Sequence, residues 1–192
     1  MSLKRFAILG GLFILLIILI VVYFKNGGEE KIKQSLNSPP PEIYQPSEEQ
    51  KEMKKIILFF LSEGDPFLHP EEREIYAQAS IAREAKQAVE ELIKGSQNGY
   101  LSPLPSQAKL RELFLTEEGV AYVDFSKDFQ VENPSGSTAE ISTIYSIVNS
   151  LTYNFKSIKK VFILIEGGEK ETLGGHINLS RPFFPQYSLI AK

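Results

Sequence analysis

The feature that most constrains this chain is an apolar stretch without any charged residue at residues 6–24. At a rise of about 1.5 Å per residue, a helix of this length is roughly 28 Å long and matches the ~30 Å hydrocarbon core of a bilayer. Because a helix satisfies its own backbone hydrogen bonds, it can cross lipid. Lys4 and Arg5 precede the stretch, so the positive-inside rule predicts a cytoplasmic N-terminus. We therefore expect residues 1–25 to form a transmembrane anchor.

A cleaved signal peptide is the main alternative for this stretch. Signal h-regions are shorter, about 7–15 residues, and end at a small-residue cleavage site. Tyr23, Phe24 and Lys25 provide no such site, which favours an uncleaved anchor. The expected protein crosses the cytoplasmic (inner) membrane once, and its globular domain is extracytoplasmic, in the periplasm or an intermembrane space.

Composition excludes several function classes. The chain has 192 residues, no cysteine and two histidines, which rules out disulfides, thiolate metal sites and cysteine nucleophiles. A multi-histidine metal site is not expected either. The net charge is −3, and some of the basic residues flank the apolar stretch. Nucleic-acid binding needs a surplus of lysine and arginine, so we expect no nucleic-acid partner.

The segment after the anchor, residues 26–53, is rich in proline and glutamate. Three successive prolines at residues 39–41 favour polyproline II, which makes a semi-rigid spacer rather than a packed element. Periodic apolar patterns begin after this linker. We expect one globular domain at residues 54–187 and a short C-terminal tail at residues 188–192.

Hydrophobic periodicity divides the domain into strands and helices. Residues 56–61 are a short apolar run bounded by charge, which is typical of a strand buried on both faces. Pro70 followed by two glutamates is a helix-start pattern. Apolar residues at steps of three and four then predict a helix up to Lys94.

The second half of the domain follows the same logic. Gly119 indicates a hairpin turn, and Ser137 with Glu140 fits a capping box at the start of a second helix. The remaining expected elements are two hairpin strands, this helix, a β-branched central strand and a short last strand, at residues 112–116, 120–126, 137–155, 161–165 and 177–179. The order β-α-β-β-α-β predicts an α/β (α+β) two-layer sandwich, with two helices on one face of a small mixed sheet.

His176, Ser180 and Arg181 are the strongest candidates for hydrolytic chemistry. A catalytic triad needs a nucleophile within hydrogen-bond reach of its base. In an extended segment, residues four apart point the same way but lie about 13 Å apart. We therefore expect structural roles, with His176 hydrogen-bonding a turn and Arg181 reaching a carboxylate or a helix end.

Glycine pairs and carboxylate pairs offer little chemistry. Gly167-Gly168 and Gly174-Gly175 lack the P-loop pattern, so we interpret them as tight turns and expect no nucleotide. Paired carboxylates in or beside predicted turns are interpreted as solvated acids; they are Glu117/Glu118, Asp124/Asp128 and Glu169/Glu171. Two apolar pairs beside loops, Tyr100-Leu101 and Phe183-Phe184, either pack in the core, which we favour, or expose a surface for a partner.

Two sequence motifs are the most distinctive in the chain. They are I-V-N-S-L-T at residues 147–152 and G-H-I-N-L-S-R-P at residues 175–182. With residues 138–141 and 160–167, they resemble the GerMN domain, a module of bacterial sporulation and spore-germination proteins. The resemblance covers roughly residues 54–185. It implies a domain similar to ring-building motifs, which pack a small sheet under two helices and associate side by side.

The resemblance implies a non-enzymatic module without catalytic, cofactor-binding or metal-binding residues. We expect a protein-binding or scaffold module of a bacterial envelope or sporulation/germination assembly, membrane-bound through residues 6–24. Its partners would be other proteins of that assembly, with self-association left open. One alternative is a domain that binds a cell-wall glycan or small ligand through exposed aromatics such as Tyr100 and Phe184. Another is a cell-wall hydrolase that uses His176 and the scattered carboxylates.

Overall fold

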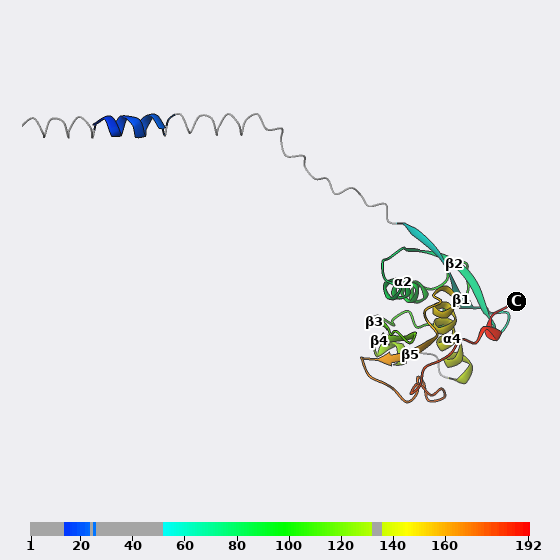
Figure 1. Ribbon diagram of the computed structural model, residues 1–192. Coiled ribbons are helices and arrows are strands. Elements are labelled where there is room, and N and C mark those ends of the chain that lie inside the picture. The colour runs from blue at the N-terminus through cyan, green and yellow to red at the C-terminus, as the bar shows by residue number, and fades with distance from the viewer. Residues whose placement is uncertain (1–13, 24, 26–51, 132–135) are drawn as a thin grey trace, which may run out of the picture. The chain divides into compact units, whose positions relative to one another are not determined.

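The computed structural model describes residues 14–23, 25, 52–131 and 136–192. Residues 14–23 are helical (Figure 1), but the rest of the expected membrane segment lies outside the described residues. Among the helices that are described, none has both the length and the apolar character needed to cross a bilayer. The expected linker also lies almost entirely outside the described residues. The compact part of the chain is residues 50–192.

This compact part begins with a β-hairpin. β1 (Met53–Leu61) and β2 (Leu68–Tyr76) are antiparallel, with Met53 opposite Tyr76 and Leu61 opposite Leu68. The prediction of a helix from Pro70 is therefore wrong. Burial along β2 alternates with period two, as in a half-buried strand. Pro70 is tolerated because its nitrogen faces away from β1, at a sheet edge.

The first long helix, α2 (Ile81–Lys94), is shorter than expected. Ser80 is its N-cap, and Gly95 follows its last turn with φ +85°. Its buried face is formed mainly by small and branched apolar residues, Ala85, Ala88, Val89 and Leu92. The expected apolar spacing is therefore correct from residue 81 onward, where it reflects a real amphipathic helix.

A three-stranded sheet follows, with the order β3-β4-β5. β3 (Leu110–Leu115) and β4 (Val120–Phe125) form the expected hairpin, and β5 (Lys160–Ile165) pairs in parallel with β4. The prediction that residues 161–165 form a central strand is wrong, because β4 is central. The outer edge of β5 is covered at its start, where Val161 and Phe183 exchange two backbone hydrogen bonds of 2.9 and 2.7 Å.

The second long helix, α4 (Ser137–Asn154), follows the short α3 (Asp128–Val131) and is buried on nearly all sides. Its N-cap is Gly136, and no side chain among the described residues caps this end. The predicted capping box is therefore wrong, because the Glu140 carboxylate turns to a distant loop instead. The chain ends in a 3₁₀ turn, η1 (Tyr187–Leu189).

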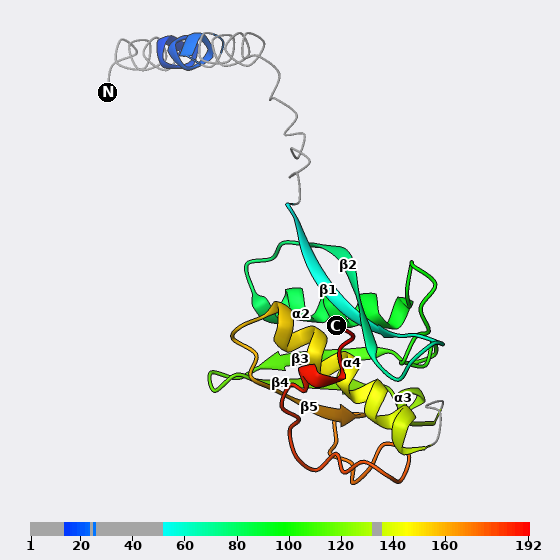
Figure 2. The same cartoon turned by 90° about the vertical axis from the view of Figure 1, so that its right-hand side faces the viewer.

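The result is an α+β domain in which α2 and α4 pack against both small sheets (Figure 2). One apolar core joins the hairpin, the two helices and the three-stranded sheet. The expected β-α-β-β-α-β order lacked β2 and hence the second sheet. Residues 177–179 form no strand of a sheet; only a single bridge joins Thr172 and Asn178.

Candidate functional site

Three polar side chains of α4 satisfy the backbone of β1 on the side that β2 leaves open. Ser146 Oγ donates to Phe59 O at 2.6 Å, and Phe59 N donates to Ser150 Oγ at 3.1 Å. One turn later, Ile57 N and O both bond the Asn154 amide. A buried strand edge without partners would be costly, so α4 replaces a neighbouring strand here.

The distinctive α4 motif also holds the C-terminal segment. Asn149 Nδ2 donates to Gln186 O at 3.0 Å, and Gln186 N donates to Asn149 Oδ1 at 2.9 Å. The Tyr187 hydroxyl lies 3.2 Å from Thr152 Oγ1. The motif at residues 147–152 therefore stabilises the fold by holding the C-terminal segment.

His176 binds a buried carboxylate from the start of α4. Its Nδ1 lies 2.6 Å from Glu140 Oε1, and Ile177 N donates to Glu140 Oε2 at 2.9 Å. Burial raises the pKa of Glu140, but hydrogen bonds from Ile177, from the His176 ring and from the backbone of Gly174 and His176 outweigh it and hold the pKa below its ordinary value. A Cβ at Gly174 would lie 2.9 Å from Glu140 Oε1, so the loop approaches the carboxylate closely.

This geometry supports the structural interpretation of His176 and not a Ser-His pair. Nδ1 of His176 already forms a hydrogen bond with the Glu140 carboxylate. Ser180 is exposed and its backbone bonds Asn178, while Arg181 is exposed and forms no ion pair with any described residue. The predicted contact of Arg181 with a carboxylate or helix end is therefore wrong.

One residue of the expected carboxylate pairs contacts one of the glycine pairs. The expectation that Asp124 is a solvated acid is wrong, because its side chain is buried. Asp124 accepts a hydrogen bond of 2.8 Å from Gly167 N, and Arg111 Nη1 lies 3.5 Å from its carboxylate. Gly167 and Gly168 form the expected tight turn after β5. Within the described residues, no three potential ligand side chains gather as a metal site would require.

The most distinctive surface is the side of the three-stranded sheet that faces away from the core. Phe114, Tyr122 and Phe162 are opposite one another in the register of β3, β4 and β5, so their side chains share this face. The rings of Tyr122 and Phe162 stack, with centroids 5.4 Å apart. Phe184 continues this face beyond β5, because its neighbour Phe183 pairs with Val161 and packs against the core and Tyr145, which places Phe184 opposite Lys160 rather than opposite Phe162. We call these four aromatic residues the outer sheet face.

The two sides of this face are exposed to solvent. Phe114 is 58% exposed and Phe184 is 63% exposed, whereas Phe162 in the middle is only 7% exposed. Lys160 Nζ lies 5.6 Å from the centre of the Phe184 ring, a cation–π distance. The face therefore combines a fixed aromatic centre with accessible rings on both sides, as in the core of many protein interfaces.

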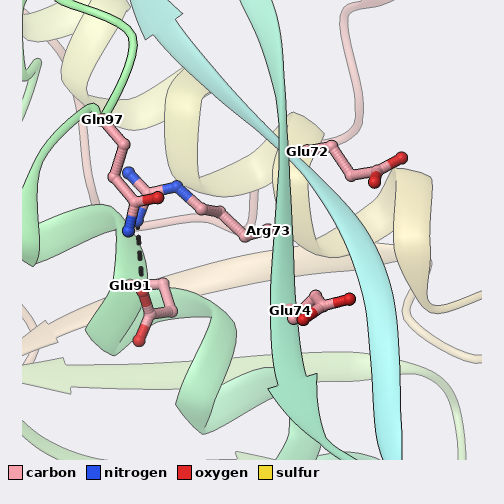
Figure 3. Close-up of a pocket in the computed structure, with 5 residues that line it drawn as sticks. All are labelled: Glu72, Arg73, Glu74, Glu91 and Gln97. Atoms are coloured by element: carbon pink, nitrogen blue, oxygen red, sulfur yellow. Dashed lines mark hydrogen bonds and ion pairs between the residues drawn. The ribbon is translucent and has the colours of Figure 1, made fainter.

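A second concave surface runs between β2 and α2. One part of it is a hollow of about 300 Å³. There Arg73 points toward Glu91 and Gln97, while Glu72 lies on the other side of the strand (Figure 3). A second hollow of about 430 Å³ continues along α2 and shares Glu74 and Glu91 with the first. We call the two hollows together the β2–α2 groove.

The wall of this groove is held by a buried ion-pair network. Arg73 Nε donates to Glu71 Oε1 at 2.6 Å, and Arg73 Nη1 donates to Glu91 Oε2 at 3.2 Å. Ser96 Oγ and the backbone nitrogens of Gln97 and Asn98 also donate to Glu71. Burial raises the pKa of Glu71, yet these donors and Arg73 hold it below its ordinary value.

The comparisons with known proteins agree with this geometry. A family model described as "Germane: Sporulation and spore germination" matches residues 57–171. The chain belongs to this family. No curated protein matches the chain.

Solved structures show the same GerMN fold. A predicted lipoprotein from Clostridium perfringens is 26% identical, with a TM-score of 0.51, and the match covers 72% of this chain and 93% of that one. The first GerMN domain of the sporulation protein GerM from Bacillus subtilis is 23% identical, with a TM-score of 0.53, and the match covers 69% and 98%. The tandem GerMN domains of GerM give 23% identity and a TM-score of 0.57, over 69% of this chain and 46% of that one.

Sequence reasoning found only part of the outer sheet face of this GerMN domain. The favoured expectation that Phe184 and Leu101 pack in the core is wrong, because the Phe184 ring is 63% exposed and Leu101 is 45% exposed. Tyr100 is instead partly buried and stacks on His69. Phe114 and Tyr122 were missed, although they occupy opposite positions in the expected hairpin. Cross-strand pairing about Gly119 was the signal that could have found them.

Proposed function

We propose that this GerMN domain is a non-enzymatic protein-binding module, and that the outer sheet face is its docking surface in an envelope or sporulation/germination assembly. The observation that carries the proposal is the group of four aromatic rings on one sheet face, in which Phe114 and Phe184 are exposed on either side of the buried Phe162. Exposed apolar surface on a monomeric protein often marks a site of protein interaction. Aromatic residues dominate the energetic centres of protein interfaces.

The chemistry of the rest of the domain also favours binding over catalysis. His176 and Glu140 bond each other and the loop backbone, so they serve the fold. Ser146, Ser150 and Asn154 are likewise used by β1. These polar residues therefore do not converge on a cleft, as acid–base catalysis would need.

We further propose that residues 6–24 tether the domain to the cytoplasmic membrane with the N-terminus inside, so that the domain is extracytoplasmic. The support is the uncharged length of this stretch and the basic pair before it. Tethering would confine the domain to a surface and raise its effective concentration toward membrane-bound partners. A phosphatase fused to the C-terminus should be active in intact cells, and activity only after lysis would contradict this orientation.

Site-specific photo-crosslinking tests the docking surface in the full-length chain in its native membranes. Phe114 and Phe184 are replaced, one at a time, by p-benzoylphenylalanine, and crosslinked products are identified by mass spectrometry. Phe67, which is 42% exposed in the loop between β1 and β2, is replaced in the same way as a matched control. We expect the same envelope or sporulation protein, or a second copy of this chain, at both test positions and not at position 67.

A loss-of-binding variant completes the test. Phe114→Ser should keep the fold because the side chain is exposed, and it should lower the yield of the crosslink formed from position 184 by at least fivefold. An unchanged yield, or equal crosslinking from position 67, would exclude the outer sheet face as the docking surface. Retention of the purified protein on peptidoglycan, lost in Phe114→Ser, would instead favour the glycan-binding alternative.

A further inference from the structure

The loop that follows α2 contains an asparagine-glycine pair, Asn98-Gly99, and both residues are exposed. The backbone nitrogen of the residue after an asparagine can attack the asparagine side chain, which closes a five-membered ring and expels ammonia. Glycine permits this attack best, because it has no Cβ to obstruct the approach and its backbone is the least restricted. The neighbour of Asn98 and its exposure therefore favour a change in the covalent structure of Asn98 itself.

The fold leaves both reacting groups free. Among the described residues, no acceptor bonds the Gly99 backbone nitrogen and no group bonds the Asn98 side-chain amide. The hydrogen bonds of Asn98 are made by its backbone nitrogen instead. A Cβ added at Gly99 would meet no atom within 4 Å, so the surroundings of this position are open. The attack therefore requires no hydrogen bond of the described structure to break.

The other three asparagines in the described part of the chain differ from Asn98. Asn149 and Asn154 use both groups of their side-chain amides in hydrogen bonds to the backbone of distant segments. Asn178 Oδ1 accepts a hydrogen bond of 2.8 Å from the backbone nitrogen two residues later. Each is followed by a residue that has a side chain: serine, phenylalanine and leucine, respectively. Ring closure at these three positions would break existing hydrogen bonds, and the following side chain would hinder it.

A change at Asn98 would reach the ion-pair network of the β2–α2 groove. Asn98 N donates to Glu71 Oε2 at 3.2 Å and to Ser96 Oγ at 3.0 Å, and Tyr100 N also donates to Ser96 Oγ at 3.0 Å. Glu71 is 2% exposed and forms a buried ion pair with Arg73. The loop around Asn98 therefore supplies donors to a buried carboxylate, which would be costly to leave without them.

We propose that Asn98 is a site of spontaneous deamidation through a succinimide formed with Gly99. The bond between Gly99 N and Asn98 Cγ forms and the bond between Cγ and Nδ2 breaks. The released NH2 group takes the proton of the Gly99 N–H and leaves as ammonia. Water then adds to either carbonyl of the ring and opens it, which leaves aspartate or isoaspartate at position 98. The only co-reactant is water.

Isoaspartate would disturb the loop more than aspartate. It adds one carbon to the main chain between Asn98 and Gly99, so the N–H groups of Asn98 and Tyr100 no longer have the spacing that lets both donate to Ser96 Oγ. Both products also add a negative charge to the loop that holds Glu71. The reaction goes beyond the proposed function and involves no residue of the outer sheet face, so either proposal can fail without the other.

Peptide mapping of the full-length chain in nanodiscs tests the reaction. The protein is kept in mildly alkaline buffer, and mass spectrometry follows each asparagine and separates aspartate from isoaspartate by electron-transfer fragmentation. We expect conversion at Asn98 at least tenfold faster than at Asn149, Asn154 or Asn178, with isoaspartate among the products. Asn26 also precedes a glycine and is resolved in a peptide of its own. Absence of isoaspartate at position 98 would overturn the proposal, because direct hydrolysis of the side-chain amide gives aspartate alone.

A denatured sample tests whether the fold leaves the site open. In urea, the rate at Asn98 should stay within threefold of the rate in the folded protein. The rate at Asn149, whose side chain is released on unfolding, should rise at least fivefold. A rate at Asn98 that is tenfold lower in the folded protein than in urea would overturn the proposal, because the fold would then protect this side chain.

One variant and the separated product complete the test. Asn98→Gln, whose longer side chain would need a larger ring, should convert at least tenfold more slowly, and an equal rate would exclude ring closure as the route. The isoaspartate form, separated by ion exchange, should unfold at a lower temperature than the unreacted protein. An equal unfolding temperature would contradict the effect of this loop on Glu71.

Discussion

Asn154 at the end of α4 exchanges two hydrogen bonds with Ile57 in β1, although 97 residues separate them in the chain. Ile57 N donates to Asn154 Oδ1 at 2.9 Å, and Asn154 Nδ2 donates to Ile57 O at 2.6 Å. The amide side chain reproduces the donor and acceptor pair that a neighbouring strand would supply. A helix thereby closes one edge of the two-stranded sheet.

Replacement of Asn154 should destabilise the domain through this edge. Asn154→Ala leaves both Ile57 backbone groups without their partner, and we expect a loss of about 1–3 kcal/mol in the free energy of unfolding. Asn154→Asp keeps the acceptor but sets a negative charge beside the Ile57 carbonyl, so it should not restore stability. Urea denaturation measures both. Asn98→Ala, at an exposed side chain, is the control and should change stability by less than about 0.5 kcal/mol.

Substitution of Glu140 should lower the free energy of unfolding more than substitution of most other polar residues. Its side chain is fully buried and accepts hydrogen bonds from the loop at residues 174–177. Glu140→Gln turns one acceptor into a donor that faces other donors, and we expect a loss of about 2–4 kcal/mol. His176→Ala should cost less, because the backbone donors remain. A cost of Glu140→Gln below that of His176→Ala would contradict this account.

The domain should become less stable as the pH falls, and protonation of Glu140 should account for part of this loss. Its pKa in the folded protein is held below the ordinary value of 4.5. A depressed carboxylate pKa contributes stability above the pKa of the unfolded chain, and this contribution is lost as pH falls through the folded pKa. The free energy of unfolding should therefore decrease from about pH 5 downward, as denaturation at several pH values will show, with a shallower decrease in Glu140→Gln. Glu71, whose pKa is also lowered, should account for part of the remaining slope.

Gly119 should tolerate no side chain, for two separate reasons. It has φ +83°, and a Cβ there would lie 2.6 Å from the Ser157 carbonyl oxygen. Gly99 has the same φ, but its Cβ would meet no atom within 4 Å. We expect Gly99→Ala to cost about 1 kcal/mol from backbone strain alone. Gly119→Ala should cost at least twice as much in thermal or chemical denaturation, and equal costs would show that the close approach is relaxed easily.

Much of the secondary structure follows from local pattern. The β3–β4 hairpin with its turn at Gly119, the strand at residues 160–165 and the long helix α4 were all expected from periodicity and turn residues. The segment from Pro70 to Tyr76 was not, because proline followed by glutamates is also a helix-start pattern. Glu71 and Arg73 can be buried there because they form an ion pair with each other, and because Ser96 and the loop backbone also donate hydrogen bonds to Glu71.

The sequence likewise predicted only some of the features of the candidate site. The structural role of His176 could be expected from the lack of a nearby nucleophile, whereas the exposure of Phe184 was only the less favoured of two alternatives. Glu140 could not be predicted as the hydrogen-bond partner of His176, because it is 36 residues away and fits a local capping box equally well. The β2–α2 groove could not be expected without knowing that β2 is a strand.

By itself, the sequence determined which segments are apolar, where the chain turns, and the family to which the domain belongs. Those properties depend on the intrinsic preferences of neighbouring residues, which act over a few positions. Only the tertiary structure decided which polar side chains would be buried, which strand would lie at an edge, and which aromatic rings would share one face. Each of these depends on groups that are distant in the chain and that stabilise one another only after folding removes water from between them.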